Sequence, residues 1–170
     1  LLIVHRENRK IQEDRFRSLI HYLKEGDVLV LNDTCVFPAR LLGKKDPGGA
    51  AIEMLLLNKL NPTDWEIIAY RASRLKIGTR VLFGDDFYCE VLQVLDEGKF
   101  HVRFFWQNGW EATLSRYGKI PLPPYIARQD GEYASLDKER YQTIYARYND
   151  LYNSAAAPTA GLHFTDELLD

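Results

Sequence analysis

The sequence predicts an α/β (α+β) domain into which a small antiparallel β-barrel is inserted. Near the N-terminus, two apolar runs flank a segment whose apolar residues recur at helical spacing, which is the strand–helix–strand order of an α/β layer. In the middle, short strand-like runs alternate with turn residues, as in a small barrel or sandwich. After Gly118 a proline-rich stretch follows. We therefore expect residues 1–45 and 118–170 to form a discontinuous α/β domain around a barrel at residues 46–117.

The N-terminal elements are predicted from their apolar patterns. Residues 1–5 predict a buried strand and residues 7–10 a turn. The apolar side chains that then recur at helical spacing are Phe16, Leu19, Ile20 and Leu23. We expect this helix to begin at Asp14 as N-cap and to stop at Gly26. Residues 28–31 are an uninterrupted apolar run directly after that stop, which predicts a core strand.

The middle of the chain predicts five or six short strands. The runs are Ile52–Leu57, Trp65–Tyr70, Thr79–Phe83, Phe87–Leu95 and Lys99–Trp106. Clusters of Gly, Asp, Asn and Pro lie between them and predict turns. We expect the aromatic residues of this region to fill the barrel core rather than to stack on bases. They are Trp65, Phe83, Phe87, Phe104, Phe105, Trp106 and Trp110.

Composition narrows the class of protein. The chain has 170 residues, 46% hydrophobic and 27% charged, which is typical of a globular domain and not of a disordered one. No apolar run approaches the length of a membrane span, and no signal-peptide pattern is present. Cys35 and Cys89 lack metal-ligand spacing, so we expect no metal and a reduced, cytoplasmic protein. The sequence begins without methionine and stops within a helix that starts at Thr165, which predicts a fragment of a longer chain.

The charge pattern leaves two interpretations open. A net charge of −2 argues against a protein that is basic overall, but a local basic stripe can still contact nucleic acid. Arg71, Arg74, Lys76 and Arg80 form such a cluster. It is either a solvated charged edge or a patch that contacts phosphates, with Arg71 and Arg74 as the candidate nucleic-acid contacts.

Asn32-Asp33-Thr34 is a candidate ligand site because it directly follows the apolar run at residues 28–31. In α/β sheets, ligands bind beyond the carboxyl ends of strands, where these polar side chains are expected. A local Asx turn is the competing interpretation.

The run from Ala155 to Thr165 places one histidine beside a backbone with little side-chain bulk. Small residues bury almost no apolar area, so the run suits a backbone that lies close to something else, with Gly161 free to take unusual dihedrals. His163 is therefore either a proton-handling group or a structural histidine in a packed turn.

Two further segments offer candidate side chains. Residues 121–126 form a stiff extended stretch, which is either a linker or a ligand wall with Tyr125 aimed inward. Residues 140–146 offer the guanidinium of Arg140 and two phenols, of which one belongs to Tyr141.

Five blocks in order make the chain resemble the S-adenosylmethionine:tRNA ribosyltransferase-isomerases of the queuosine pathway. The blocks are Asp27-Val-Leu-Val-Leu-Asn-Asp-Thr, Pro38-Ala-Arg-Leu, Pro121-Leu-Pro-Pro-Tyr-Ile, Glu139-Arg-Tyr-Gln-Thr and Ala156-Ala-Pro-Thr-Ala-Gly-Leu-His-Phe-Thr. The resemblance runs the whole length of the chain, and it implies that roughly the second half of a full member is absent. Cys35 stands where many members carry arginine, which implies a weaker contact to RNA or substrate here.

The resemblance implies a reaction in which S-adenosylmethionine is a co-substrate that donates a ribosyl unit. That unit is transferred and isomerised onto the 7-aminomethyl-7-deazaguanine base at the wobble position of tRNA. The product is epoxyqueuosine, and adenine and methionine leave. The resemblance also implies an α/β domain with an inserted barrel. The expected partners are this tRNA and S-adenosylmethionine, with no membrane, and we expect a monomer.

This chemistry assigns candidate roles to residues in the matching blocks. A base must remove a proton next to the sulfonium, and the departing adenine needs a proton donor, so His163 and Asp33 are the catalytic candidates. Arg40 and Arg140 are candidates to hold a carboxylate or a phosphate in bidentate fashion. The other substrate-binding candidates are Asn32, Tyr125, Tyr141, Thr159 and Gly161.

Two alternatives to this transferase come from other classes. One is a non-catalytic RNA-binding module built around the barrel, which would bind tRNA without dependence on S-adenosylmethionine. The other is a hydrolase that pairs His163 with Asp33, which no serine nucleophile motif supports.

Overall fold

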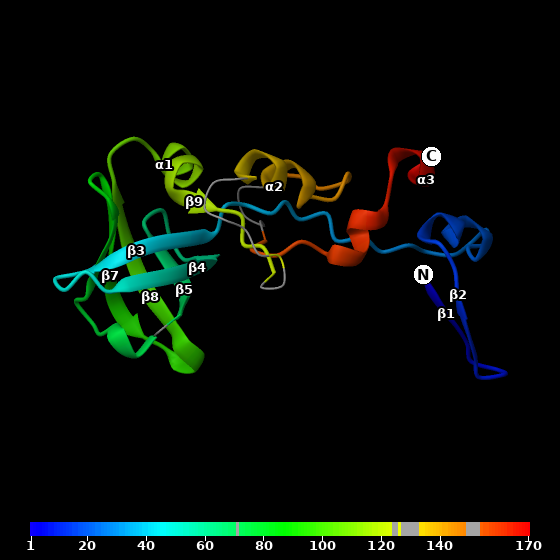
Figure 1. Cartoon of the computed structure of the whole chain (residues 1–170), viewed down its shortest axis with the longest axis horizontal. Coiled ribbons are helices and arrows are strands. Elements are labelled where there is room, and N and C mark those ends of the chain that lie inside the picture. The colour runs from blue at the N-terminus through cyan, green and yellow to red at the C-terminus, as the bar shows by residue number, and fades with distance from the viewer. Residues whose placement is uncertain (71, 124–125, 127–132, 149–153) are drawn as a thin grey trace.

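A closed antiparallel barrel forms from the middle of the chain. The computed structural model describes residues 1–70, 72–123, 126, 133–148 and 154–170. Six of the strands in these ranges build the barrel: β3 (Arg40–Asp46), β4 (Ala51–Lys59), β5 (Asp64–Tyr70), β6 (Arg80–Gly84), β7 (Phe87–Val94) and β8 (Lys99–Trp106). They are hydrogen-bonded in the order β4-β5-β8-β7-β6-β3, and β3 also pairs with β4, which closes the sheet on itself (Figure 1). The short strand β9 (Gly118–Lys119) pairs with the start of β3.

Alternating side chains of these strands fill the barrel. In β4, Ile52, Met54 and Leu56 are buried while the residues between them are partly exposed, as strand geometry requires. The prediction that the aromatic residues form the core is confirmed for the buried rings of Trp65, Phe87 and Phe104, and partly buried aromatic rings pack against them. Phe105 is the exception, because it is 36% exposed and stacks on Tyr88 with ring centroids 4.7 Å apart.

The five predicted barrel strands are confirmed to within two residues at each end. The sixth strand, β3, was allowed for but not located. Its sequence contains one glycine and four charged residues, which leaves little apolar alternation. Gly43 lies within it where backbone and side chains approach closely. A Cβ there would lie 2.7 Å from Cδ1 of Phe83 and 2.8 Å from the Leu82 carbonyl oxygen. β3 therefore belongs to the barrel although it crosses the predicted domain boundary at residue 45.

The N-terminal segment forms a hairpin and a 3₁₀ helix. The predicted strand at residues 1–5 is confirmed as β1 (Leu2–His5), but it pairs with an unpredicted β2 (Lys10–Glu13) and is largely exposed. The predicted helix is the 3₁₀ helix η1 (Phe16–His21). Arg15 occupies its N-cap position, yet the Asp14 carboxylate still holds its start, accepting bonds from the Arg15 amide at 2.7 Å and the Ser18 hydroxyl at 2.9 Å.

The core strand predicted for residues 28–31 is wrong. Val28 is 85% exposed and Val30 87% exposed, and no strand is formed there. An apolar run becomes a core strand only where neighbouring strands take its backbone hydrogen bonds and other residues cover its side chains. The described part of the chain supplies neither. The predicted fold class, an α/β (α+β) chain with an inserted antiparallel barrel, is nevertheless confirmed, with the barrel as its largest part.

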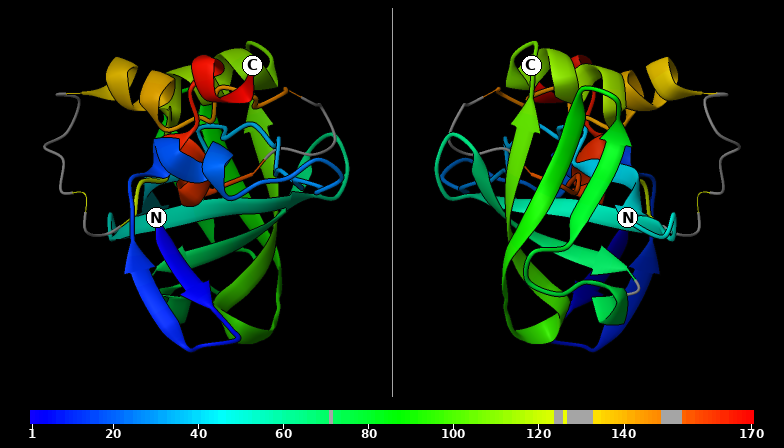
Figure 2. Two further views of the ribbon diagram at one scale, coloured as in Figure 1. Left: turned by 90° about the vertical axis from the view of Figure 1, so that its right-hand side faces the viewer. Right: turned by 90° about the vertical axis from the view of Figure 1, so that its left-hand side faces the viewer.

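The other elements connect the barrel to the hairpin. Helix α1 (Trp110–Tyr117) packs Leu114 and Trp110 against the barrel core. Figure 2 shows this helix at one end of the barrel. Helix α2 (Ala134–Arg140), the 3₁₀ helix η4 (Thr159–His163) and the segment before β3 lie between the barrel and the β1–β2 hairpin (Figure 1). Helix α3 (Asp166–Leu169) begins after Thr165, as predicted.

The remaining short helices lie between barrel strands. They are η2 (Ala72–Arg74) and η3 (Asp96–Gly98). Among the residues that the structure describes, no helix combines the length and apolar character needed to cross a bilayer.

A candidate ligand-binding cleft at the end of the barrel

Segments from three parts of the chain meet directly before β3. The side-chain amide of Gln142 bonds the backbone of Val36, and the Ser154 amide donates to the Cys35 carbonyl at 2.9 Å. Isolated parallel bridges join Thr34 to Arg147 and Val36 to Ser154. The segment before β3 is therefore held between two stretches that lie more than 100 residues later in the chain.

A small apolar cluster anchors this junction. Val36, Tyr141 and Ala157 are buried together, with partly buried Ile120, Leu122 and Leu162 packed against them. Each of these residues belongs to, or lies within a few positions of, one of the five sequence blocks. The blocks thus share a packing role that fixes the backbone around the cleft described next.

A cleft of about 1090 Å³ opens where this junction meets the barrel end. The segment before β3, the end of β4, the start of β5, helix α1 and the region of α2 all contribute to its wall. The polar lining residues are Asn32, Thr34, Cys35, Asn58, Lys59, Glu111, Ser115, Lys138, Gln142, Tyr148 and Ser154, and the apolar ones are Val36, Phe37, Pro38, Leu57, Trp65, Trp110 and Leu114.

Several polar groups of the cleft are already bonded to other protein groups. The Asn32 Oδ1 accepts from the Thr34 amide at 3.0 Å and from the Thr34 hydroxyl at 2.7 Å, which is the local Asx turn considered for this motif. The Ser154 hydroxyl donates to the Ala156 carbonyl at 2.8 Å. With Gln142 bound to Val36 through both ends of its amide, these side chains shape the cleft more than they offer it free donors.

Aromatic rings form one side of the cleft. Trp65 and Trp110 stack with ring centroids 5.3 Å apart, and Phe37 lies 6.0 Å from Trp65. Trp65 is only 7% exposed, and its indole nitrogen is buried with no hydrogen-bond partner among the described residues. A donor in this state is rare in proteins, since buried polar groups are almost always paired.

Asp33 differs from its neighbours Asn32 and Thr34 in its surroundings. Asn32 and Thr34 line the cleft, whereas the exposed Asp33 is not among its lining residues. The Asp33 carbonyl accepts from the Arg147 amide at 2.7 Å, so its backbone has a structural role. A catalytic role for the Asp33 carboxylate stays a prediction.

Arg40 and Tyr141 have structural partners in this fold. Arg40 donates to the two carboxylate oxygens of Glu53 at 2.7 and 3.1 Å, so it makes a bidentate bond to the neighbouring strand β4. Tyr141 is 7% exposed within the apolar cluster, and stacking on a base would require that cluster to open. A substrate contact for each of these side chains stays a prediction.

His163 lies outside the cleft, in η4. It is exposed, and its ring stacks on Phe16 with centroids 5.2 Å apart and planes 29° from parallel. Thr159, at the start of η4, is also exposed. Gly161 is buried, and a Cβ at its position would collide with the Tyr145 hydroxyl. The expectation that this run lies close to other parts of the chain is therefore met by Gly161.

The remaining predicted site residues are either exposed or undescribed. Arg140, the last residue of α2, and Arg74, the last of η2, are exposed. Tyr125 and Arg71 lie outside the described residues. In the part of the chain that is described, no three or more His, Cys, Asp or Glu side chains gather closely enough to hold a metal ion.

The cleft also contains residues that the sequence analysis did not select. Trp65 and Trp110 were assigned to the barrel core, which they do join, but they face the cleft as well. Lys59 and Lys138 carry no motif and lie 79 positions apart, so no local pattern could have paired them. Gln142 belonged to a matching block, and only the folded chain reveals its partner.

The chain thus combines a closed barrel with motif-bearing segments, and a partly aromatic cleft at their junction is its candidate ligand-binding site. A family model described as "Queuosine biosynthesis protein" matches residues 1–170, and the chain belongs to that family. Curated relatives named S-adenosylmethionine:tRNA ribosyltransferase-isomerase come from Caldanaerobacter subterraneus subsp. tengcongensis, at 44% identity, and Acetivibrio thermocellus, at 46% identity. Each alignment covers 100% of this chain and 48% of the relative, so the chain spans about half the length of the curated relatives it matches.

One solved structure is also similar to the chain. It is the crystal structure of S-adenosylmethionine tRNA ribosyltransferase from Thermotoga maritima, which is 26% identical. The match covers 99% of this chain and 44% of that chain, with a TM-score of 0.42.

Proposed function

We propose that the full-length protein transfers and isomerises the ribosyl unit of S-adenosylmethionine onto the 7-aminomethyl-7-deazaguanine base of tRNA. The product would be epoxyqueuosine in tRNA, with adenine and methionine released, in the cytoplasm, by a monomer that needs no metal. The observation that carries this proposal is the unbroken match of residues 1–170 to the queuosine family, together with the printed names of the relatives. The sequence blocks that meet around the cleft agree with it.

The proposed reaction needs groups that move protons and groups that hold ligands. His163 is proposed to move a proton, because its imidazole is exposed and histidine is the side chain most often used for general acid–base catalysis. Asp33, also exposed, is proposed to act as a base or to hold the ribose hydroxyls. No contact between the two is among the bonds described above, so each role is testable by itself.

The binding roles are divided between several exposed groups. Asn32 on the cleft, Arg140 at the end of α2, and Thr159 with the Gly161 amide in η4 are proposed to contact substrate. Arg71 and Arg74 are proposed to contact tRNA phosphates. Replacing both arginines by alanine is expected to weaken tRNA binding and to flatten its salt dependence, since each lost phosphate contact removes one released counterion.

Adenine release tests the proposed reaction. The full-length protein is incubated with tRNA that carries the deazaguanine precursor and with S-adenosylmethionine labelled in both the adenine ring and the ribose. Free adenine above background, with ribose label transferred to the tRNA, is the expected result. Absence of both with folded protein would remove the proposal.

A tRNA-binding module without catalysis is the second candidate. The observation in its favour is the closed barrel, whose end opens on a cleft lined by the exposed side chains of Lys59 and Lys138. It predicts that tRNA is retained in a filter-binding assay at unchanged affinity with or without S-adenosylmethionine, and that no adenine is released.

A further inference from the structure

The buried indole N–H of Trp65 is an unmet donor in the wall of the cleft. Tryptophan nitrogen can only donate, and when buried it nearly always finds an acceptor. Here none is present among the described residues, although the side chain is only 7% exposed. Because the nitrogen itself is covered, an acceptor reaches it only after a small rotation of the ring or of a neighbour. A ligand that supplies this acceptor would satisfy a bond that the protein alone leaves open.

The faces of the Trp65 ring are packed against other aromatic rings, whereas its indole N–H has no partner among the described residues. Trp110 stacks on the ring at 5.3 Å, and Phe37 packs at 6.0 Å. These contacts supply apolar partners, so the unmet interaction of Trp65 is that of a hydrogen-bond donor. The ligand atom that it fits is an oxygen or nitrogen acceptor.

The charges on the cleft select the kind of acceptor. Lys59 and Lys138 line it, and within the described ranges neither ammonium group has an ion-pair or hydrogen-bond partner. The acidic lining residue is Glu111, which already accepts a bond from the Tyr148 hydroxyl at 3.4 Å. Among the described lining residues, two ammonium groups against one carboxylate favour an anion with several acceptor oxygens.

This balance distinguishes the two ligands of the proposed reaction. S-adenosylmethionine carries a sulfonium as well as its zwitterionic amino-acid end, so its net charge is positive and the cleft repels it. A phosphodiester is anionic and presents several acceptor oxygens, which suits lysine as a point-charge partner. The cleft volume of about 1090 Å³ also exceeds the need of a compact metabolite.

We infer that this cleft binds a phosphate-bearing nucleotide of tRNA, with Lys59, Lys138 and the indole N–H of Trp65 donating to its oxygens. The choice of tRNA as the partner rests on the proposed function. The position of the anion site does not rest on the proposed function. It rests on the indole N–H of Trp65 and on the two lysines, which have no partners among the described residues. S-adenosylmethionine then binds elsewhere in the full-length protein.

The salt dependence of tRNA binding tests each donor separately. The full-length protein is titrated with the precursor tRNA at several salt concentrations, as wild type and as Lys59→Met, Lys138→Met and Trp65→Phe. Each lysine variant is expected to reduce the slope of log K against log salt by about 0.7 to 0.9, because one phosphate contact is lost. Trp65→Phe is expected to weaken binding about 10-fold with an unchanged slope, because a neutral donor releases no counterion.

Matched controls separate these effects from general ones. Lys10→Met removes a lysine from the β1–β2 hairpin, away from the barrel in Figure 1, and Trp106→Phe trims a half-buried tryptophan that does not line the cleft. Both are expected to bind tRNA as wild type does. If Trp65→Phe lowers the melting temperature more than Trp106→Phe does, the proposal is judged on the variants of the two exposed lysines alone.

Two results would overturn the inference. One is wild-type affinity and slope in both lysine variants. The other is that the variants lose S-adenosylmethionine binding in equilibrium dialysis while their tRNA binding is unchanged. That result would show that the cleft binds S-adenosylmethionine. Failure of adenine release in the wild-type protein, with the tRNA effects intact, would remove the proposed reaction and leave this site standing.

Discussion

The side-chain amide of Gln142 bonds both backbone polar groups of Val36, 106 positions earlier in the chain. Its Oε1 accepts from the Val36 amide at 2.8 Å, and its Nε2 donates to the Val36 carbonyl at 2.5 Å. Val36 is only 3% exposed, so water cannot replace these bonds. The Gln142 side chain thus satisfies the backbone hydrogen bonds of the segment before β3, as a neighbouring strand would in a sheet. These bonds fix one wall of the cleft.

Gln142→Leu is expected to lower the free energy of unfolding by about 2 kcal/mol, because a buried unsatisfied backbone group costs roughly 1–3 kcal/mol. Urea denaturation of the full-length protein measures the change. Gln93→Leu, at an exposed position on β7, is the matched control and is expected to have little effect. Equal losses in the two variants would show that the bonds to Val36 contribute nothing.

The two cysteines are expected to differ sharply in reactivity. Cys89 is fully buried in the barrel, and burial raises the pKa of its thiol, so almost no thiolate forms at neutral pH. Cys35 is half-buried and lines the cleft. A maleimide at pH 7.5 should therefore label Cys35 at least about 10-fold faster, since the thiolate is the nucleophile.

Peptide mapping by mass spectrometry over a time course measures both labelling rates. Under the further inference, bound tRNA slows labelling of Cys35. Unfolding in guanidinium should make the two rates similar, which controls for the local sequence. Equal rates in the folded protein would contradict the burial of Cys89.

Asp64 makes the barrel sensitive to acid. Its carboxylate is 3% exposed and accepts from Arg103 at 2.7 and 2.8 Å, and this pair of bonds holds the pKa of Asp64 well below its usual range. A carboxyl whose pKa is lowered by folding stabilises the fold above its unfolded pKa, near 4, and loses that contribution as the pH falls through its folded pKa. Stability due to Asp64 is therefore present at neutral pH and declines below about pH 4.

Asp64→Asn tests this directly. The variant is expected to lose about 2 kcal/mol at pH 7, a value reduced from that of a fully buried pair because Arg103 is half exposed. The deficit should shrink as the pH falls from 4 to 2. Asp96→Asn, at an exposed position in η3, is the control. A stability deficit that stays constant with pH would mean that Asp64 stabilises the barrel through packing and not through its charge.

Gly161→Ala is expected to destabilise the protein by about 1–3 kcal/mol, the usual range for overpacking a closed site. The added methyl would collide with the Tyr145 hydroxyl and lie 2.8 Å from Cγ2 of Thr143. Ala160→Ser, one residue earlier and exposed, is the control for the helix η4 itself. Wild-type melting of Gly161→Ala would mean that Tyr145 can move aside freely.

His163→Ala is expected to lower turnover by about 100-fold, the usual scale for loss of a general acid or base. Adenine release under saturating substrates measures kcat. His5→Ala, in the exposed strand β1, is the matched control. Because His163 stacks on Phe16, the variant also needs a melting curve. Unchanged turnover in folded protein would make His163 a structural residue.

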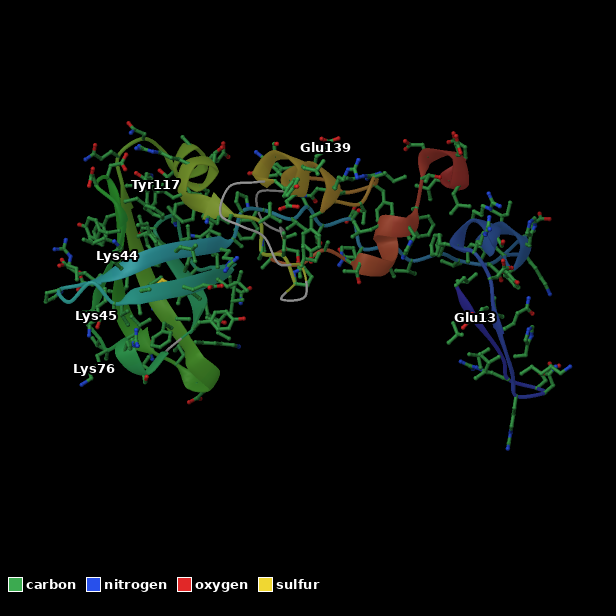
Figure 3. The ribbon with its side chains drawn as sticks, viewed as in Figure 1. Glu13, Lys44, Lys45, Lys76, Tyr117 and Glu139 are labelled. Carbon is green, nitrogen blue, oxygen red and sulfur yellow. The ribbon has the colours of Figure 1, made fainter. Side chains whose placement is uncertain are left out.

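The elements that could be predicted are those whose pattern is contained in their own residues. The barrel strands β4 to β8 combine apolar alternation with Gly and Asn turns, and all were located to within two residues. Glu13 lies on β2 and Glu139 on α2, and both residues are labelled in Figure 3. The sequence did not predict β2, and it gave no bounds for α2. β2 carries no buried face, so hydrophobic periodicity could not reveal it.

The candidate site was only partly predictable for a related reason. Asn32 was selected by its position after an apolar run, and it does line the cleft, although that run forms no strand. Lys59, Trp65 and Lys138 come from a strand end, a strand start and a helix, and nothing in their neighbours marks them as a group. Convergence of this kind depends on the path of the chain between them.

By itself, the sequence determined the barrel strands, the turns that separate them and membership of the queuosine biosynthesis family, because these depend on local patterns and on ordered blocks of residues. Only the tertiary structure decided which segments meet and that Gln142 holds Val36. It also decided that Trp65, with no acceptor among the described residues, shares a cleft with Lys59 and Lys138. The physical reason is that burial and hydrogen-bond satisfaction belong to pairs of groups brought together by folding, and no single stretch of residues contains both members of such a pair.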